Sequence, residues 1–351
     1  MKRVTYKNIH NFFRFNGVHF DRKGMRTAAY YLIKEGEAHE KAIGEFLLDW
    51  FDDKSYIDLQ TSGTTGTPKI IRKKKQALVN SALATGDFFE LKPGDTALCC
   101  LPVQFIAGKM MLVRGLILGL QIDFVSPNSQ PLAYLDKEKE YDFVAMVPLQ
   151  VENSLDELHK VKKLIIGGAK MNDSLAKKLM NVSTQVYETY GMTETITHIA
   201  AKKIGESAFS TLPNVSISQN EKDCLVIDAP QVSEERLITN DLVEIINDQQ
   251  FVLLGRIDNV VNSGGVKLIP EKIEEKLADA IPARFFVGGI PDAILGEKLV
   301  LVIEGKNQDI DEAIFAVLDK FEKPKAVFFV PIFEMTDSGK VKRKAILKAL
   351  E

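Results

Sequence analysis

One run of nine residues is rich in groups that bind phosphate. It contains five hydroxyl side chains, two glycines and one lysine, and it follows a strand-like sequence at 56–59. Glycine lets the backbone approach phosphate oxygens, while hydroxyls and the lysine charge supply further bonds. The run therefore predicts a triphosphate-binding loop, with a flexible polar turn as the alternative. The residues assigned to this loop are Thr61, Ser62, Gly63, Thr64, Thr65, Gly66 and Lys69.

Three further motifs follow the loop along the chain. They are Tyr190–Thr195 (YGMTET), Gly255–Asp258 (GRID) and Ser338–Lys340 (SGK). In this order and wording the chain resembles the adenylate-forming superfamily of acyl-CoA synthetases, peptide-synthetase adenylation domains and luciferases. The resemblance spans residues 55–351, and the local wording is most similar to the o-succinylbenzoate–CoA ligases of menaquinone synthesis. It implies an ATP-dependent acid–thiol ligase that uses Mg²⁺ and CoA.

The residues leave rival hypotheses open. Another aryl- or fatty-acyl-CoA ligase, or a ligase that loads a carrier-protein thiol, would carry the same motifs. A non-catalytic nucleotide-binding relative is a rival of a different class. The presence of both Glu194 and Lys340 argues against it, because a protein that had lost the chemistry would need neither.

Composition limits the class of protein. The chain has 351 residues, of which 45% are hydrophobic, so it can bury one large core and a smaller one. A net charge of −3 favours neither nucleic acid nor membrane as a partner, and Lys73–Lys75 is interpreted as a solvated helix start. The three cysteines show no metal-binding spacing, and no apolar signal segment follows Met1, so a reducing cytoplasm fits. The apolar run at 110–125 is too short to span a bilayer.

Hydrophobic periodicity predicts strands that alternate with helices after a polar N-terminal stretch. Strands are expected at 55–60, 69–72, 96–101, 121–125, 143–147 and 163–166, and helices at 74–90, 107–119, 148–158 and 172–180. This alternation indicates an α/β fold whose large N-terminal domain has a doubly wound, mainly parallel sheet. From about Cys224, short strands joined by Asn/Asp turns indicate an added small β unit.

Beyond Arg256 the pattern changes to that of a small α+β module. A hairpin is expected at 259–269, strands near 285, 299 and 326, and helices at 270–280, at 310–321 and at the end of the chain. We therefore predict an N-terminal adenylate-forming domain at 1–257 and a mobile C-terminal lid domain at 258–351.

Joining a carboxylate to the α-phosphate of ATP requires positive charge between two anions. The resemblance assigns that charge to Lys340, whose flexible stem suits the task, although a surface lysine is the alternative. The lid would then turn about Asp258 and present a second face to the CoA thiol. That face carries Ser263, Gly264 and Gly265, which an ordinary hairpin turn would also explain.

The remaining nucleotide contacts are also implied by the resemblance. Glu194 would hold Mg²⁺ with help from Thr193, while a helix cap is the alternative for Glu194. Asp241 would accept the ribose hydroxyls, although Asn240 precedes it where the family usually has glycine. Arg256 would contact ribose or phosphate. The residues expected to line the nucleotide through backbone or ring are Gly167, Gly168, Ala169, Tyr190 and Gly191.

The acid pocket is expected near the helix at 107–119. Phe105 stands where the family usually has histidine, and the helix carries Lys109 and Arg114 among apolar residues. Either cation would pair with the aryl carboxylate of o-succinylbenzoate, or reach solvent or a structural ion pair instead. They lie about 140° apart around a helix and are not expected to face the pocket together. His198 is a further pocket candidate, with a structural role as its alternative.

Overall fold

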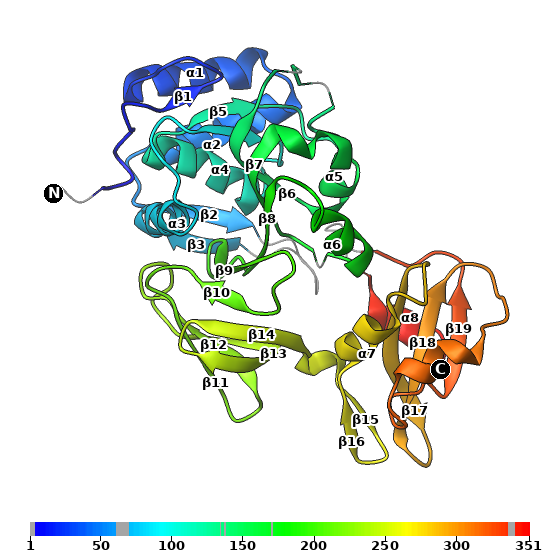
Figure 1. Ribbon diagram of the computed structural model, residues 1–351. Coiled ribbons are helices and arrows are strands. Elements are labelled where there is room, and N and C mark those ends of the chain that lie inside the picture. Colours follow the sequence, from blue (N-terminus) through cyan, green and yellow to red (C-terminus); the bar gives the residue numbers. More distant parts are fainter. Residues whose placement is uncertain (1–3, 61–69, 134, 137, 170, 336–340) are drawn as a thin grey trace. The chain divides into compact units, whose positions relative to one another are not determined.

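The chain divides into two compact units, which are described separately (Figure 1). The computed structural model describes residues 4–60, 70–133, 135–136, 138–169, 171–335 and 341–351. The first unit takes in residues 1–171, 178–216 and 228–237, and the second takes in 172–177, 217–227 and 238–351. The expected phosphate loop at 61–69 and Lys340 lie outside the described residues, and the domain boundary at 257/258 stays a prediction.

The first unit opens with a helical hairpin that the sequence analysis did not predict. After the short strand β1 (Arg14–Phe15), α1 (Arg22–Glu35) and α2 (Ala38–Trp50) pack against each other. The side chain of Asp21 accepts a bond from the backbone of the first turn of α1, which starts that helix. The second helix is anchored by its apolar face, which buries Phe46, Leu47 and Trp50 in the main core.

A parallel sheet forms the centre of this unit. Its strands are β4 (Thr96–Cys99), β5 (Gln121–Phe124), β6 (Tyr141–Met146), β7 (Val161–Ile166) and β8 (Gln185–Gly191). They lie in the order β5-β4-β6-β7-β8, all parallel, with β1 parallel to β5 at the edge. The antiparallel strands β9 (His198–Lys203) and β10 (Phe209–Thr211) follow β8. The predicted mainly parallel sheet is confirmed.

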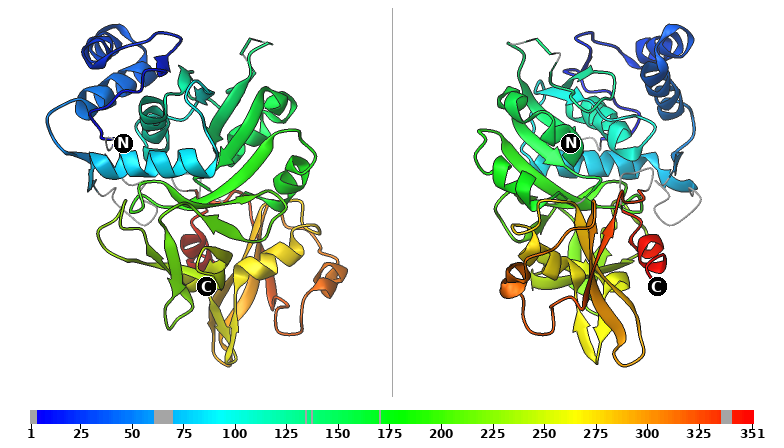
Figure 2. Two further views of the ribbon diagram at one scale, coloured as in Figure 1. Left: turned by 60° about the vertical axis from the view of Figure 1, so that its left-hand side comes forward. Right: turned by 90° about the vertical axis from the view of Figure 1, so that its right-hand side faces the viewer.

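Helices cover both faces of this sheet (Figures 1 and 2). The helices α3 (Lys75–Phe88) and α4 (Ile106–Leu118) share one apolar cluster with alternate residues of the strands, among them Ala97, Cys99 and Phe143. The short α5 (Pro148–Glu152) lies on the other face. The single helix predicted at 148–158 is wrong, because the chain breaks at Asn153 and continues as a 3-10 helix at Leu155–Lys160. The helix α6 (Asp173–Leu179) follows β7.

The two predicted strands that flank the loop at 61–69 are confirmed as β2 (Tyr56–Gln60) and β3 (Ile70–Lys74), and the structure pairs them antiparallel. The interpretation of the lysines that follow as a solvated helix start is wrong for Lys75. Its side chain is fully buried, and its ammonium lies 2.6 Å from Asp52 Oδ1. Burial of the ammonium is tolerated because this carboxylate neutralises it.

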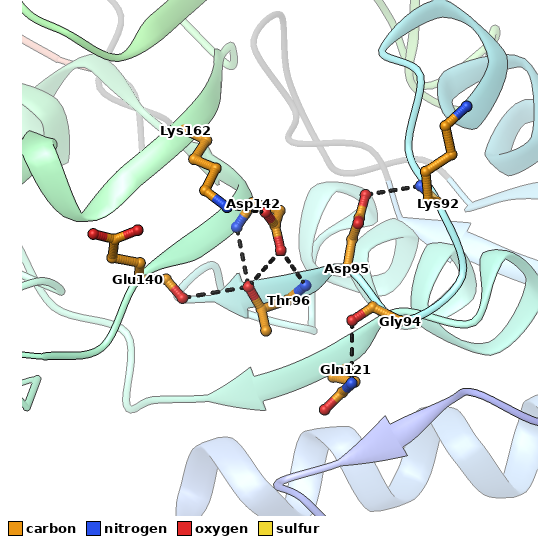
Figure 3. Close-up of polar contacts among 8 residues, drawn as sticks. All are labelled: Lys92, Gly94, Asp95, Thr96, Gln121, Glu140, Asp142 and Lys162. Carbon is orange, nitrogen blue, oxygen red and sulfur yellow. Dashed lines mark hydrogen bonds and ion pairs between the residues drawn. The ribbon is translucent and has the colours of Figure 1, made fainter.

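At the amino-terminal end of the parallel strands, where β4 begins, polar side chains join neighbouring strands (Figure 3). The backbone nitrogen and the hydroxyl of Thr96 both lie 2.8 Å from Asp142 Oδ2, and Lys162 Nζ lies 2.8 Å from Oδ1. Three adjacent strands, β4, β6 and β7, are thus tied through one carboxylate. Burial alone raises the pKa of Asp142, but the bonds from Lys162 and Thr96 outweigh it and hold that pKa below its usual range.

The second unit contains two sheets. In the first, β14 (Gln250–Arg256), β13 (Leu237–Asn247), β12 (Cys224–Asp228) and β11 (Ser216–Gln219) are neighbours in that order. The second sheet contains β15 (Val261–Ser263), β16 (Val266–Leu268), β17 (Phe285–Asp292), β18 (Gly296–Glu304) and β19 (Ala326–Val330). These confirm the predicted β unit and the strands of the α+β module.

The sheet around β18 has an apolar core on each face. Leu299, Leu301 and Ile303 cluster with residues of α7 (Pro270–Leu277), whereas Val300 and Val302 belong to the cluster that includes Ile346 of α8 (Arg343–Lys348). The helix predicted at 310–321 is shorter than expected. Only a 3-10 helix at Glu312–Val317 forms, capped by Asp311 at its start and followed by extended backbone at Leu318.

We predict that Asp142→Asn lowers the free energy of unfolding at pH 7 by about 1–2 kcal/mol, because it removes the charge that accepts bonds from two strands. Since the folded pKa is depressed, this contribution is full above the unfolded pKa of about 4. It fades as pH falls through the folded pKa, so the two proteins should converge in acid.

Urea denaturation across pH measures this difference. Glu140→Gln is the matched control, because Glu140 joins the same cluster through its backbone carbonyl rather than its side chain. A full-sized loss in the Asp142→Asn protein that persists in acid, or no loss at pH 7, would contradict the assigned role of the carboxylate.

Candidate active site

The carboxyl ends of the parallel strands form the edge at which α/β sheets bind ligands. The topological switch point of the sheet lies between β4 and β6. After β4 the chain adds β5 on one side of it and then crosses to add β6 on the other side. After β4 the chain turns into α4, and Gly108 is required there, since an added Cβ would lie 2.5 Å from the carbonyl oxygen of Pro102. Phe105 stands at the start of α4 with 54% of its surface exposed.

The end of β7 presents backbone rather than side chains. The amide of Gly167 donates to the carbonyl of Met146 at 3.2 Å, and Gly168 has a φ of +84°, which favours glycine. A Cβ on Gly167 would lie 2.6 Å from the hydroxyl of Thr189. The two glycines and the half-buried Ala169 follow directly after β7, and their contact with nucleotide stays a prediction.

The turn between β8 and β9 carries the predicted magnesium ligand. Thr195 is fully buried, and its hydroxyl lies 2.9 Å from the carbonyl of Met192 and 2.7 Å from that of Thr197. Ile196 is held at a φ of +71°, a conformation that costs a β-branched residue about 1–3 kcal/mol. The Thr195 hydroxyl, which also accepts from the backbone nitrogen of Met192 at 3.0 Å, helps to hold this turn, on which Glu194 is exposed.

Lys73 and Gly191 both help to fix this turn. The ammonium of Lys73 donates to the backbone carbonyl of Glu194 at 2.5 Å, a contact that the sequence analysis missed because the two residues lie far apart in the chain. A Cβ on Gly191 would lie 2.3 Å from the carbonyl of Thr197, so glycine is required there for packing. Tyr190 is buried, with its ring 6.0 Å from that of Phe209. The adenine contacts of Tyr190 and Gly191 stay predictions.

The described residues present a single exposed carboxylate on this turn, that of Glu194. Mg²⁺ usually takes one or two carboxylates together with substrate phosphates and water, so this residue fits a magnesium ion bound with a nucleotide. Thr193, beside it, is half-buried and carries a hydroxyl. No helix in the described part of the chain is long and apolar enough to cross a membrane.

Arg114 is the most unusual charge in the first unit. Only 1% of its surface is exposed, and its Nε has no hydrogen-bond partner among the described residues. One terminal nitrogen lies 3.6 Å from the sulfur of Met111 and the other 3.5 Å from His198 Nδ1. Burial lowers the pKa of Arg114 to about 10, so the guanidinium stays charged at neutral pH.

No carboxylate among the described residues forms an ion pair with Arg114. The nearby thiol of Cys99 does not supply the missing charge, because burial raises its pKa to about 12. A buried ion without a counter-charge is costly, and a buried group with a perturbed pKa of this kind is a candidate for a functional site.

Lys109 is less buried than Arg114. Its side chain is half-buried, and burial lowers the pKa of its ammonium, which the charge of Asp49 partly restores. His198, by contrast, is 6% exposed and contacts Arg114 directly. The structure therefore brings Arg114 and His198 together and leaves Lys109 outside this pair.

In the second unit, the predicted ribose ligand and the predicted pivot share one cation. Arg256 lies 3.2 Å from Asp241 Oδ1 and 3.0 Å from Asp258 Oδ2. The Arg256 bond holds the pKa of Asp258 below its usual range, against a smaller opposing effect of burial. Asn240 lies within β13 without a positive φ, and its amide donates to Asp258 Oδ2 at 3.1 Å. Its role here is thus a side-chain bond, not the left-handed turn that asparagine tolerates.

The glycines predicted to face the thiol form a two-residue hairpin turn between β15 and β16. Gly264 and Gly265 have φ values of +58° and +85°, as a turn that matches strand twist requires. Gly264 also donates to the carbonyl of Leu295 at 2.8 Å, and Ser263 pairs with Val266. The turn therefore explains both glycines on structural grounds, and a role toward CoA stays a prediction.

Comparison with known proteins places these observations in a family. Residues 52–231, just over half of the chain, match the family described as AMP-binding enzyme. The chain belongs to that family. An acyl-CoA synthetase (AMP-forming)/AMP-acid ligase II-like protein from Dyadobacter fermentans is 35% identical, with a TM-score of 0.63 over 93% of this chain and 98% of that one.

Two further relatives carry more specific names. The 2-succinylbenzoate–CoA ligase of Escherichia coli is 27% identical over 354 residues, which cover 91% of this chain and 76% of the relative. The o-succinylbenzoate coenzyme A synthetase of Bacillus subtilis, solved with ATP and magnesium ion, is 20% identical, with a TM-score of 0.73 over 83% of this chain and 69% of that one. The latter likeness shows the fold, and the predicted resemblance to the adenylate-forming superfamily is confirmed.

Proposed function

We propose that this AMP-binding enzyme is an acid–thiol ligase that converts o-succinylbenzoate to o-succinylbenzoyl-CoA at the expense of ATP. Family membership and the names of the E. coli and Dyadobacter relatives support the reaction class. In the first step a carboxylate oxygen attacks the α-phosphorus of ATP, forming the acyl-adenylate and releasing pyrophosphate. In the second step the CoA thiol attacks the acyl carbon and AMP leaves. ATP and CoA are cytoplasmic metabolites, so we place the enzyme in the cytoplasm.

The uncompensated charge of Arg114 is the observation that carries the substrate assignment. o-Succinylbenzoate has two carboxylates, of which the aliphatic one reacts and the aryl one needs a cationic partner. A buried guanidinium with an unused N–H and no acid among the described residues suits that partner. A fatty acid or a simple aryl acid would leave the buried cation unpaired, so these alternative substrates fit the site less well.

The other roles follow the family resemblance and stay proposals. Glu194 on its strained turn would hold Mg²⁺, which when bound offsets phosphate charge, and Thr193 would support it. Asp241 would accept ribose hydroxyls, for which its bond with Arg256 would have to rearrange. Lys340 would place positive charge between the reacting carboxylate and the α-phosphate. The adenylate is a good leaving group, so thiol attack depends on positioning more than on a strong base.

Pyrophosphate release with a panel of acids tests the function. We expect ATP- and CoA-dependent turnover with o-succinylbenzoate, and much weaker turnover with 4-oxo-4-phenylbutanoate, which lacks only the aryl carboxylate. Benzoate and a medium-chain fatty acid test the rival ligases. Absence of turnover with o-succinylbenzoate would refute the substrate, and absence with every acid would favour a non-catalytic nucleotide-binding protein.

Arg114→Met should raise the KM for o-succinylbenzoate by ~100-fold, because one charged hydrogen-bonded pair is lost, while the KM for ATP stays nearly unchanged. The same change should raise the free energy of unfolding by about 1–3 kcal/mol, since it replaces an unpaired buried ion with an apolar side chain. Steady-state kinetics and urea denaturation measure the two effects. Lys109→Met is the matched control on the same helix, and an equal KM effect there would contradict the assignment to Arg114.

Lys340→Ala is expected to abolish formation of acyl-adenylate while leaving thiolation of supplied acyl-adenylate largely intact. The reason is that the lysine would bridge two anions only in the first step. Pyrophosphate release and CoA ester formation, assayed separately, distinguish the steps. Lys344→Ala, a nearby cation of the same module, is the control. Equal loss of both steps on replacing Lys340 would rule out this division of labour.

A further inference from the structure

Arg114 and His198 belong to a chain of buried polar groups that reaches α3. His198 Nε2 lies 3.3 Å from the hydroxyl of Thr85, and that hydroxyl lies 2.9 Å from the carbonyl oxygen of Ser81. Thr85 and Ser81 are both buried. The order of contacts is therefore Ser81 carbonyl, Thr85 hydroxyl, His198 ring and Arg114 guanidinium.

The direction of each bond in this chain follows from what its ends can do. A carbonyl oxygen only accepts, so the Thr85 hydroxyl donates its one hydrogen to Ser81. The oxygen of Thr85 must then accept from His198 Nε2–H. A neutral imidazole with its hydrogen on Nε2 has a lone pair on Nδ1, and that lone pair faces the Arg114 N–H at 3.5 Å.

The imidazole ring is held neutral and in place. The pKa of His198 lies well below its usual range because burial, and secondly the charge of Arg114, disfavour the imidazolium. The ring of Phe89 stands edge-on to the imidazole, with centroids 5.9 Å apart. Thr197 Oγ1 also lies 3.5 Å from Nδ1, where a donated hydroxyl would suit the same tautomer.

A neutral acceptor orients Arg114 without cancelling its charge, which an acidic residue would do. A carboxylate at this position would neutralise Arg114 and occupy its donors. An imidazole nitrogen at 3.5 Å accepts one N–H weakly, leaving the positive charge uncompensated and Nε without a partner among the described residues. The cation is thus oriented by the protein but not satisfied by it.

We propose that His198 is a positioning residue for acid recognition: oriented by Thr85, it accepts one N–H of Arg114 and directs the remaining guanidinium donors to the second carboxylate of a dicarboxylic substrate. This inference rests on the proposed function for the identity of the substrate. It adds a residue, a tautomer and a reason why a neutral acceptor stands beside the buried cation.

Two substitutions of nearly equal shape separate this role from a structural one. His198→Asn keeps a neutral acceptor near the position of Nδ1, whereas His198→Asp puts a carboxylate in the same place. We expect His198→Asp to lower kcat/KM for o-succinylbenzoate by ~100-fold, because its charge competes with the substrate for Arg114. The value for 4-oxo-4-phenylbutanoate should change little, and thermal stability should be retained or raised. His198→Asn should retain most of the preference for the diacid.

Thr85→Val provides a second variant in case His198→Asp folds poorly. Val has a similar shape but lacks the hydroxyl, so the imidazole is free to change tautomer and the diacid-to-monoacid ratio of kcat/KM should fall. Thr85→Ser, which keeps the hydroxyl, should retain the wild-type ratio. If all four variants change both acids in parallel, or if His198→Asp leaves the ratio unchanged, His198 has only a packing role.

Binding measured without ATP distinguishes failure of this inference from failure of the proposed function. The wild-type protein should be stabilised in thermal denaturation by o-succinylbenzoate, and His198→Asp should lose that shift. A shift that depends on His198 without any catalytic turnover would refute the ligase function but keep the positioning role. No shift and no turnover in the wild-type protein would refute both.

Discussion

A buried positive charge without a protein counter-charge is the constraint on which the proposed site depends. Arg114 lies in α4, a helix whose other buried residues are almost all apolar, and among the described residues it has no carboxylate partner. Most proteins avoid this arrangement, because an unpaired buried ion lowers stability. The same unpaired cation attracts an anion. It therefore costs stability in the free protein but favours a substrate that carries a matching anionic group.

Polar groups are hydrogen-bonded differently at the two ends of the parallel strands. Where β4 begins, Asp142 is satisfied by Thr96 and Lys162, and the cluster serves the register of three strands (Figure 3). Toward the other end, Ile196 is held in a strained conformation and Arg114 has an orphaned nitrogen. Satisfied groups stabilise a fold, while strain and unsatisfied charge are characteristic of functional sites. The polar groups at the amino-terminal end of the strands therefore stabilise the fold, whereas those toward the carboxyl end are the candidates for function.

The second unit differs from the first in that its predicted functional charges are already paired. Arg256 bonds to both Asp241 and Asp258, and Asn240 adds a bond to the latter. Binding of a ribose at Asp241 would exchange one protein bond for a ligand bond, at little net change in charge. Pairing of this kind holds the carboxylate of Asp241 in one orientation until a ligand arrives.

The sequence by itself determined the family, the alternation of strands and helices, and the list of candidate groups. These follow from local composition: the glycine- and threonine-rich loop, the motif at Tyr190–Thr195 and periodic apolar residues are all readable without three-dimensional contacts. The sequence also predicted that Lys109 and Arg114 would not both face the acid pocket, since helical geometry alone fixes the angle between them.

Only the tertiary structure decided which cation is buried and what surrounds it. The contacts of Arg114 with His198, of His198 with Thr85 and of Lys73 with Glu194 join residues that are distant in the chain, and no local pattern encodes them. Burial likewise arises only when elements pack, which is why the lysine at the start of α3 proved to be fully enclosed. Chemistry that depends on desolvation and on a fixed tautomer is therefore a property of the assembled core, not of the motif.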